Sequence, residues 1–182
     1  MTFFNIVVPL YNAEKWISRC LKTVKAQDYE NYRVAIVNDC STDDSASIIE
    51  REIKGNDRFS LITTEENGGA LNSTFVGIEH LQPNDEGVVL VLDGDDWFAR
   101  KDVLTILDNT YGNNDCLMTY GSYIEYPSNV RGKFSRQLPE NVIKDKLFRS
   151  SLWMTSHLRT FRYKLWKNVR REDVVGAKGQ IY

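Results

Sequence analysis

The chain has 182 residues, of which 42% are hydrophobic and 12% aromatic. This composition is that of a compact domain with a buried core, and it excludes a chain that is disordered throughout. Residues 1–130 hold 10 Lys and Arg against 21 Asp and Glu, whereas residues 131–182 hold 13 against 4. The acidic first part would repel nucleic acid and no nucleic-acid-reading motif is visible, so we expect no nucleic-acid partner.

Short apolar runs alternate with helical stripes along the first 110 residues. We predict strands at residues 3–8, 32–37, 59–63 and 87–92, each followed by a helix whose apolar residues recur at helical spacing. This alternation predicts an α/β fold: a three-layer α/β/α sandwich with a mostly parallel, Rossmann-like central sheet. Beyond residue 115 the pattern weakens. There we expect a strand at residues 116–124, a loop at 127–139 and no firm elements over 148–166.

Neither a membrane span nor a disulfide framework is predicted. The apolar stretch at residues 3–10 is too short to cross a bilayer and lacks the basic segment of a signal peptide. Cys20, Cys40 and Cys116 are odd in number and far apart, without the spacing of a zinc site. We therefore predict a cytoplasmic protein. The basic segment 131–171 leaves open a peripheral contact with an anionic membrane, a contact with a phosphorylated ligand, or a solvated face.

Three carboxylates stand within four positions directly after the fourth predicted strand: Asp93, Asp95 and Asp96. They repel one another, which is costly unless a cation or strong hydrogen-bond donors offset the charge. Carboxylate oxygens suit Mg²⁺ and Mn²⁺, and Gly94 lets the backbone approach closely. The alternative is an acidic turn in which Asp96 or Asp102 only caps a helix. The position after a buried strand favours a site for Mn²⁺ or Mg²⁺.

Four motifs, each after a predicted strand, resemble those of the family 2 glycosyltransferases in order and spacing. They are Val-Val-Pro-Leu-Tyr-Asn at 7–12, Val-Asn-Asp-Cys-Ser-Thr-Asp at 37–43, Asn-Gly-Gly at 67–69 and Leu-Asp-Gly-Asp-Asp-Trp at 92–97. The resemblance covers residues 3–110. It implies the GT-A fold, a nucleoside diphosphate sugar donor, a divalent metal, and an inverting transfer to an acceptor hydroxyl.

The resemblance also implies a division of the chain. Residues 1–182 form a single glycosyltransferase domain, with a nucleotide-sugar-binding half at 1–110 and an acceptor-side half, possibly incomplete, at 111–182. We expect an N-terminal or truncated part of a catalytic domain. A UDP-sugar is the favoured donor, and a carbohydrate, glycolipid or glycoprotein is the expected acceptor.

Specific residues take roles from the resemblance. Asp39 is expected to hydrogen-bond the base or ribose. The first carboxylate of the acidic motif is expected near the ribose and the later ones near the metal, with Asp95 as the strongest ligand candidate. The donor-binding residues are Pro9, Tyr11, Asn12, Asn38, Asp39, Asn67, Gly68, Asp93 and Gly94, and the metal candidates are Asp95, Asp93, Asp96 and His157.

Two positions depart from the family pattern. Asn38 stands where the family often has a first Asp, and its amide can still pair with a base edge. Thr74 and Phe75 stand where many members carry an Arg-Asn pair. A cationic contact to the diphosphate is therefore missing from that position.

The catalytic base and the role of His157 stay open. Glu172 and Asp173 are candidates for the base, the alternative being an ion-paired, solvated turn. The family usually supplies the base from the region after this segment, which would lie beyond Tyr182. An imidazole is a good ligand for Mn²⁺, so His157 is a candidate third ligand or acceptor contact, with packing among aromatic residues as the alternative.

Two other functions remain as alternatives. The first is a non-catalytic nucleotide-sugar-binding domain or scaffold that keeps the pocket and lacks the base. The second is a sugar nucleotidyltransferase. The motif Pro-Leu-Tyr-Asn at residues 9–12 argues against the second, because such enzymes carry a Gly-rich, Arg-containing loop after their first strand.

Overall fold

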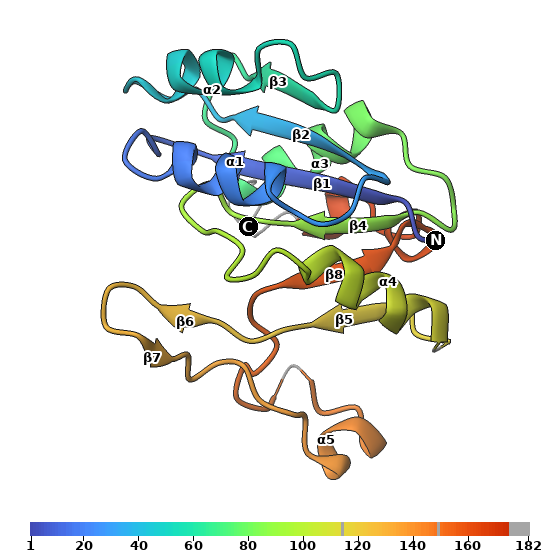
Figure 1. The fold of residues 1–182 in the computed structure, drawn as a ribbon. Coiled ribbons are helices and arrows are strands. Elements are labelled where there is room, and N and C mark those ends of the chain that lie inside the picture. The colour runs from blue at the N-terminus through green and yellow to red at the C-terminus, as the bar shows by residue number, and fades with distance from the viewer. Residues whose placement is uncertain (114, 149, 175–182) are drawn as a thin grey trace.

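The computed structural model describes residues 1–113, 115–148 and 150–174 and has a layered α/β architecture (Figure 1). The strands are β1 (Phe4–Leu10), β2 (Tyr32–Asn38), β3 (Phe59–Thr63), β4 (Val88–Val91), β5 (Met118–Tyr120), β6 (Ile124–Glu125), β7 (Val130–Arg131) and β8 (Arg159–Arg162). The helices are α1 (Ile17–Lys25), α2 (Ser45–Ile53), α3 (Ala70–Leu81), α4 (Val103–Asn113), α5 (Glu140–Lys144), α6 (Tyr163–Trp166) and the 3₁₀ turn η1 (Arg171–Val174).

The main sheet has six strands in the order β3-β2-β1-β4-β8-β5. The four strands β3, β2, β1 and β4 are parallel, and β8 runs antiparallel between β4 and β5. The prediction of a mostly parallel sheet is confirmed. The predicted strand at residues 116–124 is wrong in extent, because β5 alone joins the sheet there while β6 pairs with β7 in a separate hairpin.

Helices cover both faces of the sheet, as the alternating pattern predicts. Side chains along a strand point alternately to its two faces. In β1, Ile6 and Val8 belong to the core beneath α1, α2 and α4, whereas Val7 belongs to the core beneath α3. Figure 1 shows α1 and α4 in front of the sheet and α3 behind it. None of the described helices combines the length and apolar character needed to cross a bilayer.

Some of the basic side chains late in the chain form ion pairs with acidic side chains earlier in it. Basic side chains of β8, α6 and η1 pair with acidic side chains at the end of α3 and before β4. The pairs are Arg162–Glu86, Lys164–Glu86, Lys167–Asp85 and Arg171–Glu79. Exposed pairs of this kind each contribute little to stability, but together they neutralise part of the late basic segment.

Helix α3 packs against β1 and β2 at Gly77. A Cβ atom at this position would lie 2.5 Å from Cγ1 of Val7 and 3.2 Å from Cγ2 of Val37. The lack of a side chain at Gly77 therefore sets the distance between α3 and the sheet, and with it the position of the loop that precedes α3.

We predict that Gly77→Ala lowers the free energy of unfolding by about 1–3 kcal/mol, because the added methyl group overpacks this contact. Gly112→Ala in α4 is the control. Its Cβ would meet nothing within 4 Å, and replacing a helical glycine there should raise stability by about 0.5–1 kcal/mol. Urea unfolding followed by circular dichroism measures both. Equal effects of the two substitutions would contradict the close packing of α3.

Candidate functional site

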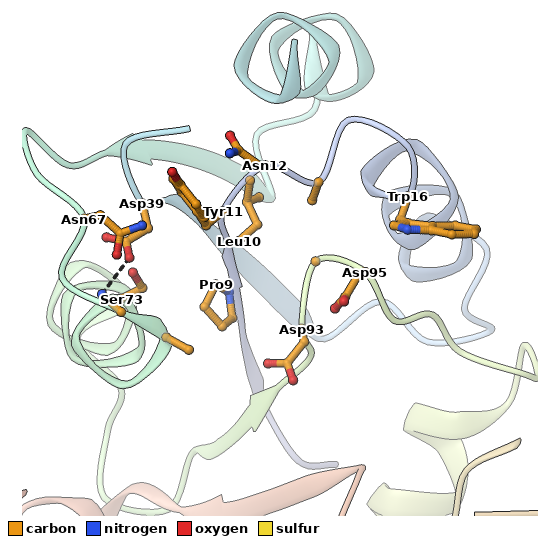
Figure 2. A pocket seen from close by; sticks show the side chains of 14 residues that line it. Pro9, Leu10, Tyr11, Asn12, Trp16, Asp39, Asn67, Ser73, Asp93 and Asp95 are labelled. Atoms are coloured by element: carbon orange, nitrogen blue, oxygen red, sulfur yellow. Dashed lines mark hydrogen bonds between the residues drawn. The ribbon is translucent and has the colours of Figure 1, made fainter. Parts of the chain in front are cut away.

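A pocket of about 460 Å³ opens at the carboxyl ends of β1, β2 and β4 (Figure 2). It is lined by Pro9, Leu10, Tyr11, Asn12, Ala13, Trp16, Asp39, Asn67, Gly69, Ala70, Ser73, Asp93, Gly94 and Asp95. Each of the four sequence motifs contributes to this lining. They meet because the carboxyl ends of neighbouring parallel strands lie along one edge of the sheet.

The acidic loop after β4 is fixed to β1 through the backbone. The N–H of Leu92 donates to the carbonyl of Val7, and that of Gly94 donates to the carbonyl of Pro9, both at 3.0 Å. A Cβ at Gly94 would lie 2.6 Å from Cβ of Leu10. Only glycine allows this approach, so Gly94 holds the carboxylates on either side of it at the pocket.

The loops after β1 and β2 brace each other through side chains of the second motif. The side-chain oxygen of Asn12 accepts the backbone N–H of Thr42 at 2.8 Å, and the backbone N–H of Asn12 donates to Oγ of Ser41 at 2.9 Å. The backbone N–H of Ala13 donates to Oγ of Ser45. From the sequence, Asn12 was predicted only as a donor-binding residue. Asn12 lines the pocket while its carboxamide oxygen holds the neighbouring loop.

Asp39 fixes the glycine loop that forms the opposite wall. Its carboxylate accepts the backbone N–H groups of Gly68 and Gly69 at 3.0 and 2.7 Å, and the hydroxyl of Thr64 at 3.1 Å. The residue is only 2% exposed. A carboxylate has about four acceptor sites, so capacity for one more donor remains on Asp39, which also lines the pocket.

Two predicted donor-binding residues, Asn38 and Gly68, are not part of the pocket lining that the described residues form. Asn38 is 1% exposed, and its side-chain oxygen accepts the backbone N–H of Ser41 at 3.2 Å. Gly68 gives its N–H to Asp39. Both residues instead take part in hydrogen bonds that fix the loops around the pocket.

Asp93, Asp96 and His157 each bring one potential ligand atom into a group whose atoms all lie within 4.8 Å of one another. Nδ1 of His157 lies 3.5 Å from Oδ2 of Asp96 and 3.9 Å from Oδ2 of Asp93. The antiparallel register explains the meeting. Val91 in β4 pairs with Arg159 in β8, so the residues just before β8 lie beside the loop just after β4.

The electrostatics of this group favour a bound cation. Burial raises the pKa of Asp93 and of Asp96, His157 opposes the shift at both, and neighbouring carboxylates add to it. Partly buried, crowded carboxylates gain most when a cation offsets their charge. Two carboxylates and one imidazole fit a divalent ion such as Mn²⁺ or Mg²⁺, and the imidazole favours Mn²⁺ of the two.

Asp95 lies apart from this three-residue group. Its side chain is exposed, and it lines the pocket between Asp93 and Trp16 in the view of Figure 2. Asp95, the strongest metal candidate from the sequence, thus faces the pocket only. Asp93 lines the pocket and also lies beside His157, and Asp96 lies beside His157.

The candidates for the catalytic base are held elsewhere. Arg170 contacts Glu172 at 2.6 Å and Asp173 at 2.8 Å, and all three side chains are largely exposed. Neither carboxylate lines the pocket. Their surroundings are those of the ion-paired turn that the sequence offered as the alternative.

Solved structures with the same architecture include one of TarS residues 1–349 from Staphylococcus aureus in complex with UDP. It superposes with a TM-score of 0.71 at 24% identity, covering 99% of this chain and 53% of that one. A second is the mannosyltransferase PcManGT from Pyrobaculum calidifontis in complex with GDP-Man and Mn²⁺, with a TM-score of 0.59 at 19% identity, covering 90% of this chain and 45% of that one. The expectation of a GT-A fold is confirmed.

Curated proteins of similar sequence are also named as glycosyltransferases. Glycosyltransferase GlyA of Streptococcus pneumoniae is 33% identical over 102 residues, which are 56% of this chain and 14% of the relative. Poly(ribitol-phosphate) beta-N-acetylglucosaminyltransferase TarS of S. aureus is 28% identical over 188 aligned positions, covering 100% of this chain and 32% of the relative. The chain therefore spans less than half the length of these relatives. The family model "Glycosyl transferase family 2" matches residues 5–172, and the chain belongs to that family.

Proposed function

We propose that the chain forms the donor-binding part of a glycosyltransferase that moves a sugar from a UDP-sugar, with a divalent metal, to an acceptor hydroxyl with inversion. The observation that carries the proposal is one pocket with Asp39 at one end and the Asp93, Asp96 and His157 group beside the other. The complexes of TarS with UDP and UDP-GlcNAc, and of PcManGT with GDP-Man and Mn²⁺, support this donor class and a metal.

The nucleoside would occupy the end of the pocket at Asp39. Figure 2 shows Tyr11 and Asn67 beside Asp39 there. Tyr11 is 51% exposed, so its ring has a free face for a base to stack on. Asp39 retains acceptor capacity for an N–H or hydroxyl of the nucleoside.

Ser73 provides a further donor contact on this side. Its Oγ is buried at the pocket wall and has no hydrogen-bond partner among the described residues. Burying a hydroxyl without a partner costs free energy. Because the Oγ is inaccessible in this conformation, the Ser73 side chain would rotate about its Cα–Cβ bond to meet a bound donor, which would then supply the missing partner.

The diphosphate would lie toward the acidic loop. Asp93, Asp96 and His157 would hold the metal, and Asp95 stays a proposed ligand on the pocket side. When bound, the metal would neutralise negative charge on the departing diphosphate. The chain's own part is to hold these ligands in place through Gly94 and through the β4–β8 pairing.

The substituted family position supports this dependence on a metal. The hydroxyl of Thr74 donates to the carbonyl of Ala70, and the ring of Phe75 packs against Trp166 with ring centres 4.5 Å apart. Neither side chain is cationic. Charge neutralisation of the diphosphate would therefore fall to the metal group rather than to α3.

The remaining parts of the proposal are less specific. We assign the base to neither Glu172 nor Asp173, since Arg170 pairs with both.

The name of TarS, which describes transfer to poly(ribitol-phosphate), supports a carbohydrate-type polymer as acceptor. A cytoplasmic location stays a proposal that rests on three free cysteines. A non-catalytic binding domain is the alternative, and donor turnover by the full-length protein would distinguish it.

We predict that UDP-GlcNAc binds in the presence of Mn²⁺ and that a chelator abolishes binding. Asp96→Asn and His157→Gln should each weaken the Mn²⁺-dependent affinity by about tenfold or more, since each removes one ligand, equivalent to ~1.4 kcal/mol. Isothermal titration calorimetry measures this.

His80→Gln is the matched control, because His80 is exposed on α3; its affinity should equal that of the wild type. Asp95→Asn decides the remaining ligand: a loss as large as that of Asp96→Asn places Asp95 on the metal. Binding that is indifferent to the chelator would refute the metal proposal.

We predict that Ser73→Ala leaves the free energy of unfolding unchanged or raises it, because it deletes a buried hydroxyl without a partner. The same substitution should weaken UDP affinity about three- to tenfold, the value of one hydrogen bond.

Ser60→Ala provides the contrast, because the Ser60 hydroxyl donates to the carbonyl of Val34. It should lower stability and leave UDP affinity intact. Calorimetry and urea unfolding measure both quantities. Wild-type affinity in Ser73→Ala would remove Ser73 from the donor site.

A further inference from the structure

A cluster of three aromatic rings lies at the metal-side end of the pocket. Trp16 comes from the start of α1, Trp97 directly follows the acidic loop, and Tyr126 follows β6 in the hairpin. The rings of Trp16 and Trp97 stack with centres 5.9 Å apart, and Tyr126 meets Trp97 edge-on at 5.4 Å. We call Trp16, Trp97 and Tyr126, together with Arg19, the aromatic platform.

Two cations lie against these rings. The guanidinium of Arg19 lies 3.8 Å from the ring centre of Trp97 and 4.8 Å from that of Tyr126, and the ammonium of Lys15 lies 4.5 Å from the ring centre of Trp16. Within the described residues no carboxylate forms an ion pair with Arg19 or Lys15. The cations are thus positioned by the rings and retain their charge for a ligand.

The platform is a surface feature rather than part of the core. Tyr126 is 56% exposed, Trp16 and Trp97 are half-buried, and none of the three rings belongs to either hydrophobic core described for the sheet faces. An aromatic patch that stays accessible beside a pocket, rimmed by charge, is typical of a binding surface.

Its position relative to the donor site is defined by two residues. Trp16 also lines the pocket, at the end away from Asp39 in Figure 2, and Trp97 is adjacent in sequence to Asp96 of the metal group. A ligand on the platform would therefore adjoin the metal group while leaving the nucleoside end free.

We propose that the aromatic platform binds an acceptor sugar ring that carries an anionic group, either a carboxylate or a phosphodiester. This inference rests on the proposed donor site. Tyr126, which meets both indoles edge-on and is 56% exposed, offers apolar ring surface for a sugar face. Because Arg19 is stacked, its N–H groups, which lie in the guanidinium plane, are available at its edge for an oxyanion. Lys15, whose ammonium lies 4.5 Å from the ring centre of Trp16, adds a second positive charge to the cluster.

Sugar binding can be followed by NMR through the indole N–H signals of the chain loaded with UDP and Mg²⁺, which avoids paramagnetic broadening. The probes are methyl β-glucoside, methyl β-glucuronoside and methyl β-glucoside 6-methylphosphate. All three should shift the signals of Trp16 and Trp97 and leave that of Trp153 unchanged. The two anionic probes should bind about fivefold more tightly than the neutral one. Their relative affinities distinguish a carboxylate from a phosphodiester.

Two variants test the platform itself. Arg19→Gln should remove the advantage of the anionic probes, and Tyr126→Ala should weaken all three; neither should change UDP affinity. Arg58→Gln is the matched control for Arg19, because Arg58 stacks on Tyr32 away from the pocket. Trp153→Ala, which removes an exposed ring stacked on another aromatic side chain, is the control for Tyr126. Both controls should behave as wild type.

The outcomes separate this inference from the proposed function. If the chain binds UDP but no probe shifts Trp16 or Trp97, or if Arg19→Gln keeps the anionic preference, the platform is not the acceptor site and the donor proposal stands. If probes bind while UDP and UDP-GlcNAc bind under no metal condition, the acceptor role is overturned together with the proposed function. If Tyr126→Ala is unfolded by circular dichroism, the Arg19→Gln comparison alone decides.

Discussion

Repulsion among Asp93, Asp95 and Asp96 is the constraint on which the site depends. Three carboxylates follow a strand whose residues are almost fully buried, and the hydrogen bond from Gly94 to β1 prevents the loop from moving away into solvent. Burial and mutual repulsion raise the pKa of Asp93 and Asp96. Holding these carboxylates together without a bound cation costs free energy at this place in the fold. A bound cation would relieve that cost, so this geometry favours the cation-bound form.

The opposite wall of the pocket is organised by hydrogen bonds to one carboxylate rather than by repulsion among several. The carboxylate of Asp39 is surrounded by backbone N–H groups and a hydroxyl, and Asn12 links the first two loops. These hydrogen bonds set the loop positions before a ligand arrives, which reduces the ordering that binding requires. The pocket therefore combines a preorganised end at Asp39 with a charged end at the acidic loop.

The sequence predicted the parts of this arrangement that depend on local pattern. The four motifs could be placed at one edge because strand periodicity and the rule for parallel sheets suffice. His157 was a candidate third ligand from the chemistry of imidazole alone. Its place beside the acidic loop could not be derived, because that depends on β8, a four-residue strand in a mixed aromatic and basic stretch without clear periodicity. The aromatic platform was not predicted, because its rings come from three segments that are far apart in the sequence. For Asn38 the sequence could not show which way the side chain points, because a polar residue at a strand end can face either the pocket or the next loop, and here its oxygen accepts the N–H of Ser41.

The aromatic platform and the metal group define an order of contacts along the pocket. Asp39 lies at one end, the carboxylates in the middle and Trp16 at the other. A nucleoside diphosphate sugar bound along this line would have its nucleoside and diphosphate in contact with residues at the carboxyl ends of β1, β2 and β4. Its sugar would then point toward elements contributed by the second half of the chain. His157 and Tyr126 both come from that half, and both reach the acidic loop or its neighbour Trp97. The antiparallel strand and the hairpin thus extend the sheet toward the place where, under the proposed function, a second substrate would arrive.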